Sequence, residues 1–283
     1  MLTINKTMDR SDLLTPEAKS VVRRINDLIE EVYSRGLHMT SWYGTLPDFL
    51  ESEKGVGIAN RGRDYTQLLE MADDRRLPWY LYWEIFWVLI HGPSLKAGDR
   101  VLDAGGTSSL FSCYLASLGI EVHSIDLNGR LVANGNTLTK NMKWNMHSYH
   151  MDMSHLDFSD GFFDHAYSIC VFEHLDNKTK ILSLEEIARS LKPGGVLSIT
   201  FDYRNPAPNV FGYGSDTRTE NQLKTREDLE RVFLSTKYFE IMGNREFHDN
   251  GQSYLVHPRL GNHPYTFGAI FLRKKDLPGP TGK

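Results

Sequence analysis

Short apolar runs alternate with helix-length segments through the middle of the chain. The segment LFSCYLASLG at 110–119 has helical character and follows the first run. The runs that read as strands lie within residues 100–109, 120–127, 145–152, 164–175 and 191–202. Strands that alternate with helices predict an α/β fold with a doubly wound, mostly parallel sheet. Two later runs, at 238–242 and 268–273, predict an antiparallel pair at the sheet edge. Before them, Thr225 with Asp228 three residues later predicts a helix start.

The amino-terminal part of the chain has helical patterns instead. Thr15, Pro16 and Glu17 predict a helix start, and apolar residues at helical spacing continue as far as Gly36. In LPWYLYWEIFWVLI, at 77–90, a helical stripe predicts packing against the sheet; it consists of Trp79, Trp83, Phe86, Trp87 and Ile90. We therefore expect a helical cap or lid at 1–95, one α/β domain at 96–275 and a flexible tail at 276–283.

Acidic residues at the ends of the predicted strands provide the candidate chemistry. Asp103 ends the first run and precedes the small residues AGGTSS, so the amino end of the next helix faces a ligand. Asp126 ends the second run, where a carboxylate accepts hydrogen bonds from both ribose hydroxyls of an adenosine. The alternative is that Asp126 caps the next helix. Asp152 follows the third run and is placed to accept from an adenine amine. The pattern predicts a nucleotide-type cofactor site.

Four sequence blocks, in this order, resemble the class I S-adenosylmethionine-dependent methyltransferases of the kind called methyltransferase type 11. They are VLDAGG, HSIDL, MDMSHLDFSDGFFDHAYS with VFEHL, and LKPGGVLSITF, and they span residues 100 to about 202. The resemblance implies a Rossmann-like, doubly wound, seven-stranded and mostly parallel sheet, with S-adenosyl-L-methionine as cofactor. It assigns cofactor contacts to Asp103, Ala104, Gly105, Gly106, Thr107, Asp126, Leu127, Asp152, Met153 and Cys170.

The loop after the first strand departs from the family pattern DxGxGxG. Thr107 and Ser109 stand where the family has its second and third glycines. Glycine allows close backbone approach and positive φ, so Thr107 is expected to shift the loop or to donate its hydroxyl to the cofactor carboxylate. A degenerate, non-catalytic binding domain is therefore an open alternative. A nicotinamide-dependent oxidoreductase is disfavoured, because Asp152 and the segment FDGFFDHAYS would have no role in it.

The resemblance implies methyl transfer to an oxygen or nitrogen of a small-molecule acceptor. Such transfer needs in-line placement of the nucleophile and, for a hydroxyl, one base. Candidate bases are His174, Asp202, Tyr203 and His248, with Asp249 and His257 as further candidates. We expect no metal: Asp202 and Asn205 offer oxygen ligands, but an oxygen-ligand site needs more carboxylates near the end of the fourth strand, which reads SICVFEH.

Segments without a clear helix or strand pattern are expected to line the cofactor and acceptor pockets. Tyr43, Arg63 and Tyr65 are candidates to touch the methionine end of the cofactor, although an ordinary surface loop fits the sequence equally well. The inserts within 203–224 and 243–267 are expected to wall the acceptor pocket.

Composition narrows the class of partner. The 283 residues include 32 basic and 36 acidic residues, a net charge of −4, and show no basic stripe, which disfavours nucleic acid. Cys113 and Cys170 lack metal-type spacing and the chain start lacks an export signal, so we expect a reducing, cytoplasmic location. Segment 77–90 is too short to span a bilayer and contains Glu84, so no membrane partner is expected. The aromatic cap is compatible with a homodimer.

Overall fold

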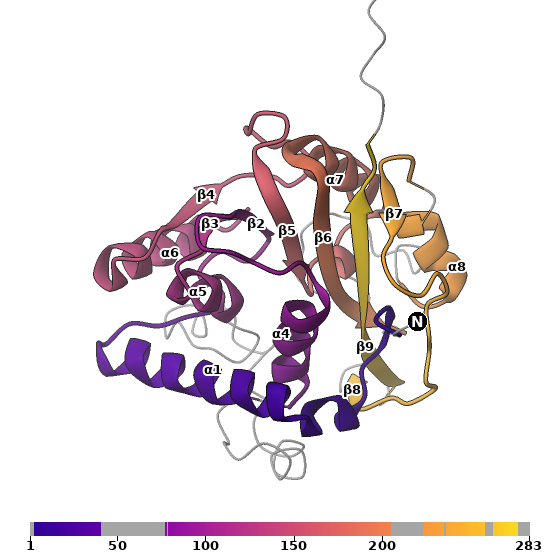
Figure 1. The fold of residues 1–283 in the computed structure, drawn as a ribbon, viewed down its shortest axis with the longest axis horizontal. Coiled ribbons are helices and arrows are strands. Elements are labelled where there is room, and N and C mark those ends of the chain that lie inside the picture. Colours follow the sequence, from indigo (N-terminus) through magenta and orange to yellow (C-terminus); the bar gives the residue numbers. More distant parts are fainter. Residues whose placement is uncertain are drawn as a thin grey trace, which may run out of the picture.

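The computed structural model describes residues 3–40, 77, 79–204, 223–234, 236–257 and 263–276 (Figure 1). The candidate contacts Tyr43, Arg63 and Tyr65 lie outside the described residues. So do most of the insert after residue 204, part of the later insert and the tail from residue 277.

A parallel sheet forms the centre of the fold, in the order β4-β3-β2-β5-β6. Its strands are β2 (Arg100–Ala104), β3 (Glu121–Asp126), β4 (Met146–His150), β5 (Phe163–Ile169) and β6 (Leu191–Tyr203). The long strand β9 (His263–Lys274) pairs antiparallel with β6, and β7 (Phe239–Ile241) pairs antiparallel with β9. The predicted doubly wound, mostly parallel sheet and its antiparallel edge pair are confirmed.

The outer edge of β9 carries two short strands that the sequence pattern did not predict. They are β1 (Lys6–Thr7) and β8 (Leu255–His257), and with them the described sheet has nine strands. The partners β8, β1 and β7 follow one another along β9, at Tyr265, Gly268 and Leu272. Strands of two and three residues are too short to show a period of two. Their pairing satisfies backbone groups that an open edge would expose.

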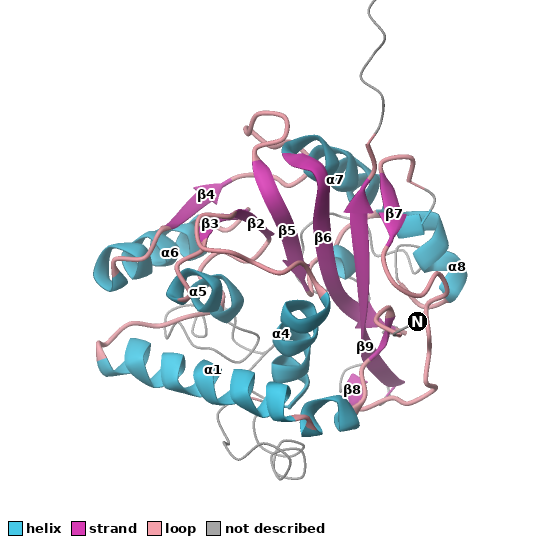
Figure 2. Ribbon diagram, in the orientation of Figure 1, coloured by secondary structure: helices cyan, strands magenta, loops and turns pink. Residues whose placement is uncertain are grey.

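Helices cover both faces of the sheet (Figure 2). On one face, α4 (Trp79–His91), α5 (Leu110–Ser117) and α6 (Gly129–Met142) pack against the sheet, and α1 (Pro16–Ser34) packs on α4 and α5. The other face packs against α7 (Asn177–Ser190) and α8 (Arg226–Leu229), which continues as a π-helical turn at Glu230–Leu234. Short 3-10 helices lie at Arg10–Leu14 and Phe172–His174. Two apolar cores result, one on each face of the sheet.

Helix starts predicted from the sequence are confirmed. Thr15 caps α1, because its Oγ1 accepts from the Ala18 N–H at 3.1 Å and Pro16 takes the first position. Thr225 and Asp228 form the capping box of α8: Thr225 Oγ1 accepts from the Asp228 N–H at 3.2 Å, and Asp228 Oδ2 from the Thr225 N–H at 2.9 Å.

The aromatic helix α4 lies between α1 and the sheet (Figure 1). Every residue from Trp79 to Val88 is buried, so the helix is covered on all sides and not along one stripe only. Ile90, expected in the stripe, is 45% exposed in the last turn. No helix in the described part of the chain is long and apolar enough to cross a bilayer.

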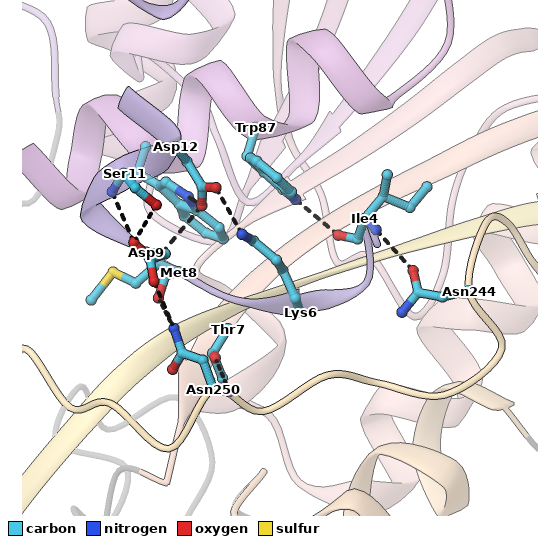
Figure 3. A network of polar contacts seen from close by, with 11 residues as sticks. Ile4, Lys6, Thr7, Met8, Asp9, Ser11, Asp12, Trp87, Asn244 and Asn250 are labelled. Atoms are coloured by element: carbon cyan, nitrogen blue, oxygen red, sulfur yellow. Dashed lines mark hydrogen bonds and ion pairs between the residues drawn. The ribbon is translucent and has the colours of Figure 1, made fainter. Parts of the chain in front are cut away.

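The amino-terminal segment is tied to both α4 and the sheet edge (Figure 3). The Trp87 Nε1–H donates to the Ile4 carbonyl at 2.8 Å, and the Lys6 ammonium pairs with Asp12 at 2.7 Å. The Trp83 Nε1–H donates to the same Asp12 carboxylate at 2.7 Å. These bonds fix the position of α4, and therefore of its side chains, relative to the sheet.

Asn5, the residue before β1, links the segment after β7 to β9. Its buried Nδ2 donates to the carbonyls of Met242 and Asn244 at 2.5 and 2.9 Å. Its Oδ1 accepts from the Phe271 N–H at 2.8 Å. One side chain therefore satisfies a backbone N–H of β9 and two carbonyls that follow β7.

Replacing Asn5 by Ala is expected to lower the free energy of unfolding by about 2–4 kcal/mol, because three backbone groups lose their partners in a buried place. Urea denaturation followed by circular dichroism measures the change. Leu14→Ala, at a position 54% exposed in the same segment, is the control and should stay within about 0.5 kcal/mol. Equal stability of Asn5→Ala and wild type would show that water replaces the amide there.

Candidate functional site

The carboxyl ends of β2, β3, β5 and β6 meet at one edge of the sheet, where open α/β sheets bind ligands. The loop after β2 is held tightly against this edge. Gly105 has φ of +87°, and its N–H donates to the Ile125 carbonyl at 2.9 Å. A Cβ on Gly105 would lie 2.7 Å from both methyl carbons of Val171, and a Cβ on Gly106 would overlap the Asp103 carboxylate. Both positions therefore require glycine.

Asp103 organises the start of α5. Its Oδ2 accepts from the hydroxyls of Ser112 at 2.7 Å and Ser109 at 3.3 Å. Ser109 itself caps α5, since its Oγ accepts from the Ser112 N–H at 3.0 Å. Burial raises the pKa of Asp103 to about 6. The serine that departs from the family's glycine pattern is therefore the cap that begins the helix.

Thr107 lies buried in the same loop. Its Oγ1 has no hydrogen-bond partner among the described residues. The neighbouring Ser108 has φ of +58°, and Thr40 fastens the loop: its N–H donates to the Ser108 carbonyl at 2.7 Å, and its carbonyl accepts from the Leu110 N–H at 2.9 Å. The amino-terminal segment thus supports the loop, and the buried Thr107 hydroxyl within the loop has no partner in the described part of the chain.

Asp126 ends β3 beside this loop. Its Oδ1 accepts from the Asn128 N–H at 2.7 Å, and burial raises its pKa to about 6. Asn128, and not Asp126, is the cap of α6, because Asn128 Oδ1 accepts from the Arg130 N–H at 3.0 Å. The carboxylate of Asp126 is therefore not used as a helix cap.

Asp152 follows β4 and is exposed, with Oδ1 accepting from the Ser154 N–H and hydroxyl, both at 2.8 Å. The preceding residue, Met151, donates its N–H to the Asp126 carbonyl at 3.1 Å. Asp126 and Asp152 therefore follow adjacent strand ends. Leu127 is 47% exposed beside them, whereas Met153 is buried in the core under β4.

A buried group of acids lies at the ends of β5 and β6. The Cys170 thiol donates to Glu84 Oε1 of α4 at 2.7 Å. Glu173 Oε1 accepts from the Asp202 N–H at 3.2 Å. Ligand-type atoms of Cys170, Glu173 and Asp202 all lie within 4.8 Å of one another. The cluster formed by Glu84, Cys170, Glu173 and Asp202 is called the acid cluster below.

Burial keeps protons on Glu84, Cys170 and Glu173. Burial, together with the charge of Asp202, raises the pKa of Glu84 to about 8. Burial and the same neighbour raise the pKa of Glu173 well above its ordinary range. The pKa of Cys170 is also raised, by burial and then by the carboxylates around it. The thiol is thus a hydrogen-bond donor at neutral pH and not a thiolate.

A family model described as a methyltransferase domain matches residues 102–199, from β2 to near the end of β6. Residues 102–199 belong to the class I S-adenosylmethionine-dependent methyltransferases. The methyltransferase domain uses S-adenosylmethionine as its cofactor, and the chain is an enzyme of this class. No curated protein sequence matches the chain.

Solved structures share the fold of the methyltransferase at low sequence identity. The cyclase SpnF is 18% identical, with a TM-score of 0.53 over 72% of this chain and 84% of its own. The MccD protein is 19% identical, with a TM-score of 0.52 over 68% of this chain and 97% of its own. A protein from Pyrococcus horikoshii OT3 is 16% identical, with a TM-score of 0.50 over 76% and 93%. Because one of these is a cyclase by name, the shared fold does not specify the reaction.

The structure separates the four candidate bases of the methyltransferase. Asp202 faces α4 and joins the acid cluster, whereas Tyr203 points to the other face, as alternate strand residues do, and packs against Phe247. Burial raises the pKa of Tyr203 to about 12. Burial lowers the pKa of His174 to about 4, so its imidazole is neutral at pH 7. His248 is exposed beside β1, and β1 and β9 separate it from β6.

Two residues of the acid cluster were not selected from the sequence. Glu84 was used only as an argument against a membrane segment, although it is the one charged residue in a helix of aromatic and aliphatic residues. Glu173 was included in the block VFEHL but given no role of its own. A lone acid in an apolar helix is the signal that would have indicated Glu84, because a buried carboxylate needs a partner or a proton.

Glu84 is expected to make stability depend on pH. Its folded-state pKa of about 8 lies above the ordinary 4.5, so its contribution is fully present below about pH 4.5 and is lost as pH rises through 8. Across this window the wild type should lose up to about 1.4 kcal/mol per pH unit more than Glu84→Gln, which has no proton to lose. Urea denaturation of both proteins at pH 5, 6, 7 and 8 measures the difference, and parallel curves would place the proton elsewhere.

Proposed function

We propose that this protein transfers the methyl group of S-adenosylmethionine to an oxygen or nitrogen of a small-molecule acceptor. The observation that carries the proposal is that the loop after β2 and the acid cluster lie side by side. Val171 packs on Gly105, and the Ser168 hydroxyl donates to the Ala104 carbonyl at 3.0 Å. A cofactor-type loop is thereby joined to the acid cluster, which contains the candidate base Asp202, at the same sheet edge.

The residues of the loop fit the cofactor. Gly105 and Gly106 keep side chains out of the space next to the backbone, and the buried Thr107 hydroxyl has a hydrogen bond to give. We assign the ribose hydroxyls to Asp126 and the adenine amine to Asp152, which follow adjacent strands. When bound, the cofactor supplies an electrophilic sulfonium methyl group. The protein has to hold it, orient the acceptor and take up the acceptor's proton.

Asp202 is the candidate base that the geometry favours. It is 6% exposed at the carboxyl end of β6 and lies within 4.8 Å of ligand-type atoms of Cys170 and Glu173. Tyr203 faces the opposite core, and His248 belongs to a segment beyond β1. The neutral imidazole of His174 is a second possible proton acceptor, since it is uncharged at pH 7.

A non-catalytic binding protein is the second reading, which rested on Thr107 and Ser109. The helix cap formed by Ser109 and the hydroxyl donor at Thr107 both support a working loop. Turnover separates the two readings. Release of S-adenosylhomocysteine in the presence of an acceptor supports the enzyme.

Asp126→Asn is expected to weaken binding of S-adenosylhomocysteine by about 1.5–3 kcal/mol, because hydrogen bonds to a charged acceptor are lost. Asp152→Ala should also weaken it. Isothermal titration calorimetry measures both. Asp157→Asn, at a side chain 78% exposed in the loop before β5, is the control and should bind like wild type. Unchanged affinity in Asp126→Asn would place the ribose elsewhere.

Thr107→Val should separate binding from stability. Valine has the shape of threonine without the hydroxyl, and this hydroxyl is buried without a partner in the described part of the chain, so stability should stay equal or rise. Binding of S-adenosylhomocysteine should weaken about tenfold, the value of one hydrogen bond of about 1.4 kcal/mol. Calorimetry together with thermal unfolding measures both quantities. Wild-type affinity in the variant would mean that Thr107 shapes the loop without touching the cofactor.

A further inference from the structure

A second group of side chains, away from the cofactor edge, has the composition of a metal site. We infer that Glu121, His123 and His147 bind one zinc ion, which fastens the edge strand β4 to β3. The three residues lie in the amino-terminal halves of these strands, whereas the cofactor edge lies at the carboxyl ends. The inference is therefore independent of the proposed function.

The register of β3 and β4 brings the two histidines together. The strands are parallel neighbours, and His123 is the direct partner of His147, with ring centroids 4.9 Å apart. Glu121 precedes His123 by two residues in the same strand, so its side chain lies on the same face of the sheet. Ligand-type atoms of all three lie within 4.8 Å of one another, and small side-chain rotations bring them to the ~2.1 Å ligand distance of one ion. We expected no metal from the sequence, which does not show this register.

His123 is the buried member of the group and is firmly held. It is 5% exposed, and Phe158 and Phe162 pack their rings against its imidazole at nearly right angles. Its Nε2 lies 3.0 Å from Glu121 Oε1, and its Nδ1 lies 3.1 Å from the Tyr149 hydroxyl. Because a hydroxyl can donate or accept, Tyr149 can take the Nδ1 hydrogen while Nε2 offers its lone pair to a metal. Metal-binding histidines are oriented by an outer partner of this kind.

The ligand set favours zinc over a hard cation. Two imidazoles and one carboxylate make a three-ligand zinc site, which takes water in the fourth position. Mg²⁺ and Ca²⁺ prefer six or more oxygen ligands, whereas imidazole nitrogen suits transition metals. His147 is exposed and the Glu121 side chain is 26% exposed, so an ion can enter from solvent and keep a water molecule.

Two polar contacts compete with the ion, and both are weak. The Arg100 Nε lies 3.6 Å from Glu121 Oε1, and the two side chains are 45% and 26% exposed. An ion pair so exposed contributes little. His147 Nε2 lies 3.3 Å from Asn145 Oδ1, also in an exposed place. Both contacts can therefore give way to an ion that the carboxylate and the two imidazoles hold together.

The position of the ion gives it a structural role. Among the described strands β4 is the last at its end of the sheet, so it pairs with β3 alone. Ligands from both strands cross-link this edge, and the unfolded chain does not hold them together, so zinc stabilises the folded state. Asp126 lies three residues beyond His123, roughly 10 Å along the strand. The ion is thus separate from the cofactor and from methyl transfer.

The test is zinc binding by the full chain, prepared without a histidine tag and treated with EDTA. Isothermal titration with Zn²⁺ should show one ion per chain, with a dissociation constant in the micromolar range or below. His147→Ala and Glu121→Gln should each weaken binding by at least about tenfold, because each removes a ligand. His155→Ala, which removes a histidine side chain 86% exposed outside the group, should bind like wild type. An excess of Mg²⁺ should not displace the ion.

Thermal unfolding provides a second readout that does not depend on activity. In EDTA, His147→Ala should unfold at the wild-type temperature, because it loses an exposed side chain. Zn²⁺ should raise the unfolding temperature of wild type and His155→Ala, but not of the two site variants. Folded wild type that binds no stoichiometric zinc overturns the inference. Binding that survives in both site variants, or that His155→Ala loses, also overturns it, since the ion then binds elsewhere. Several weakly bound ions per chain would be adsorption to surface histidines and have the same consequence.

Discussion

Removal of carboxylates from water at the carboxyl ends of parallel strands is the constraint on which this structure depends. Asp103 and Asp126 meet it with nearby donors: two serine hydroxyls for Asp103 and the Asn128 N–H for Asp126. Glu84 and Glu173 meet it by keeping a proton. The two solutions divide the edge into a part with donors placed for a polar cofactor and a part whose buried carboxyls keep their protons. The loop glycines and the helix caps follow from holding the first part in place.

The amino-terminal segment has a larger role than a cover. β1 extends the sheet along β9, Asn5 joins it to the last strands, and Thr40 holds the loop after β2. Through Trp87 and Trp83 the same segment fixes α4, the helix that brings Glu84 to the acid cluster. The cofactor loop and the acid cluster therefore share one support, and part of the candidate site comes from residues outside the matched domain at 102–199.

Much of this architecture could be read from the sequence, for identifiable reasons. Strand and helix periods differ, so the order of β2, α5 and β3 was visible, and the caps Thr15 and Thr225 were recognisable because their side chains act locally. β1 was not, because two residues have no period and their pairing depends on β9, more than 250 positions away.

The site was predictable to the same extent. The candidate cofactor positions come directly after predicted strands, so the pattern of strands in the sequence located them. The acid cluster depends on the packing of α4 against β6 and β9, which is a tertiary contact that the sequence pattern does not show. The opposite facing of Asp202 and Tyr203 could have been deduced, since neighbours in a strand point to opposite faces. Which of the two side chains lies toward α4 could not be deduced from the sequence.

Calorimetric titration of the full chain with S-adenosylhomocysteine tests the central claim most directly. The account predicts one site per chain with a dissociation constant in the micromolar range, and weaker binding when Asp126 loses its charge. A protein that unfolds cooperatively, and is therefore folded, yet releases no heat and shows no thermal stabilisation with this ligand would contradict it.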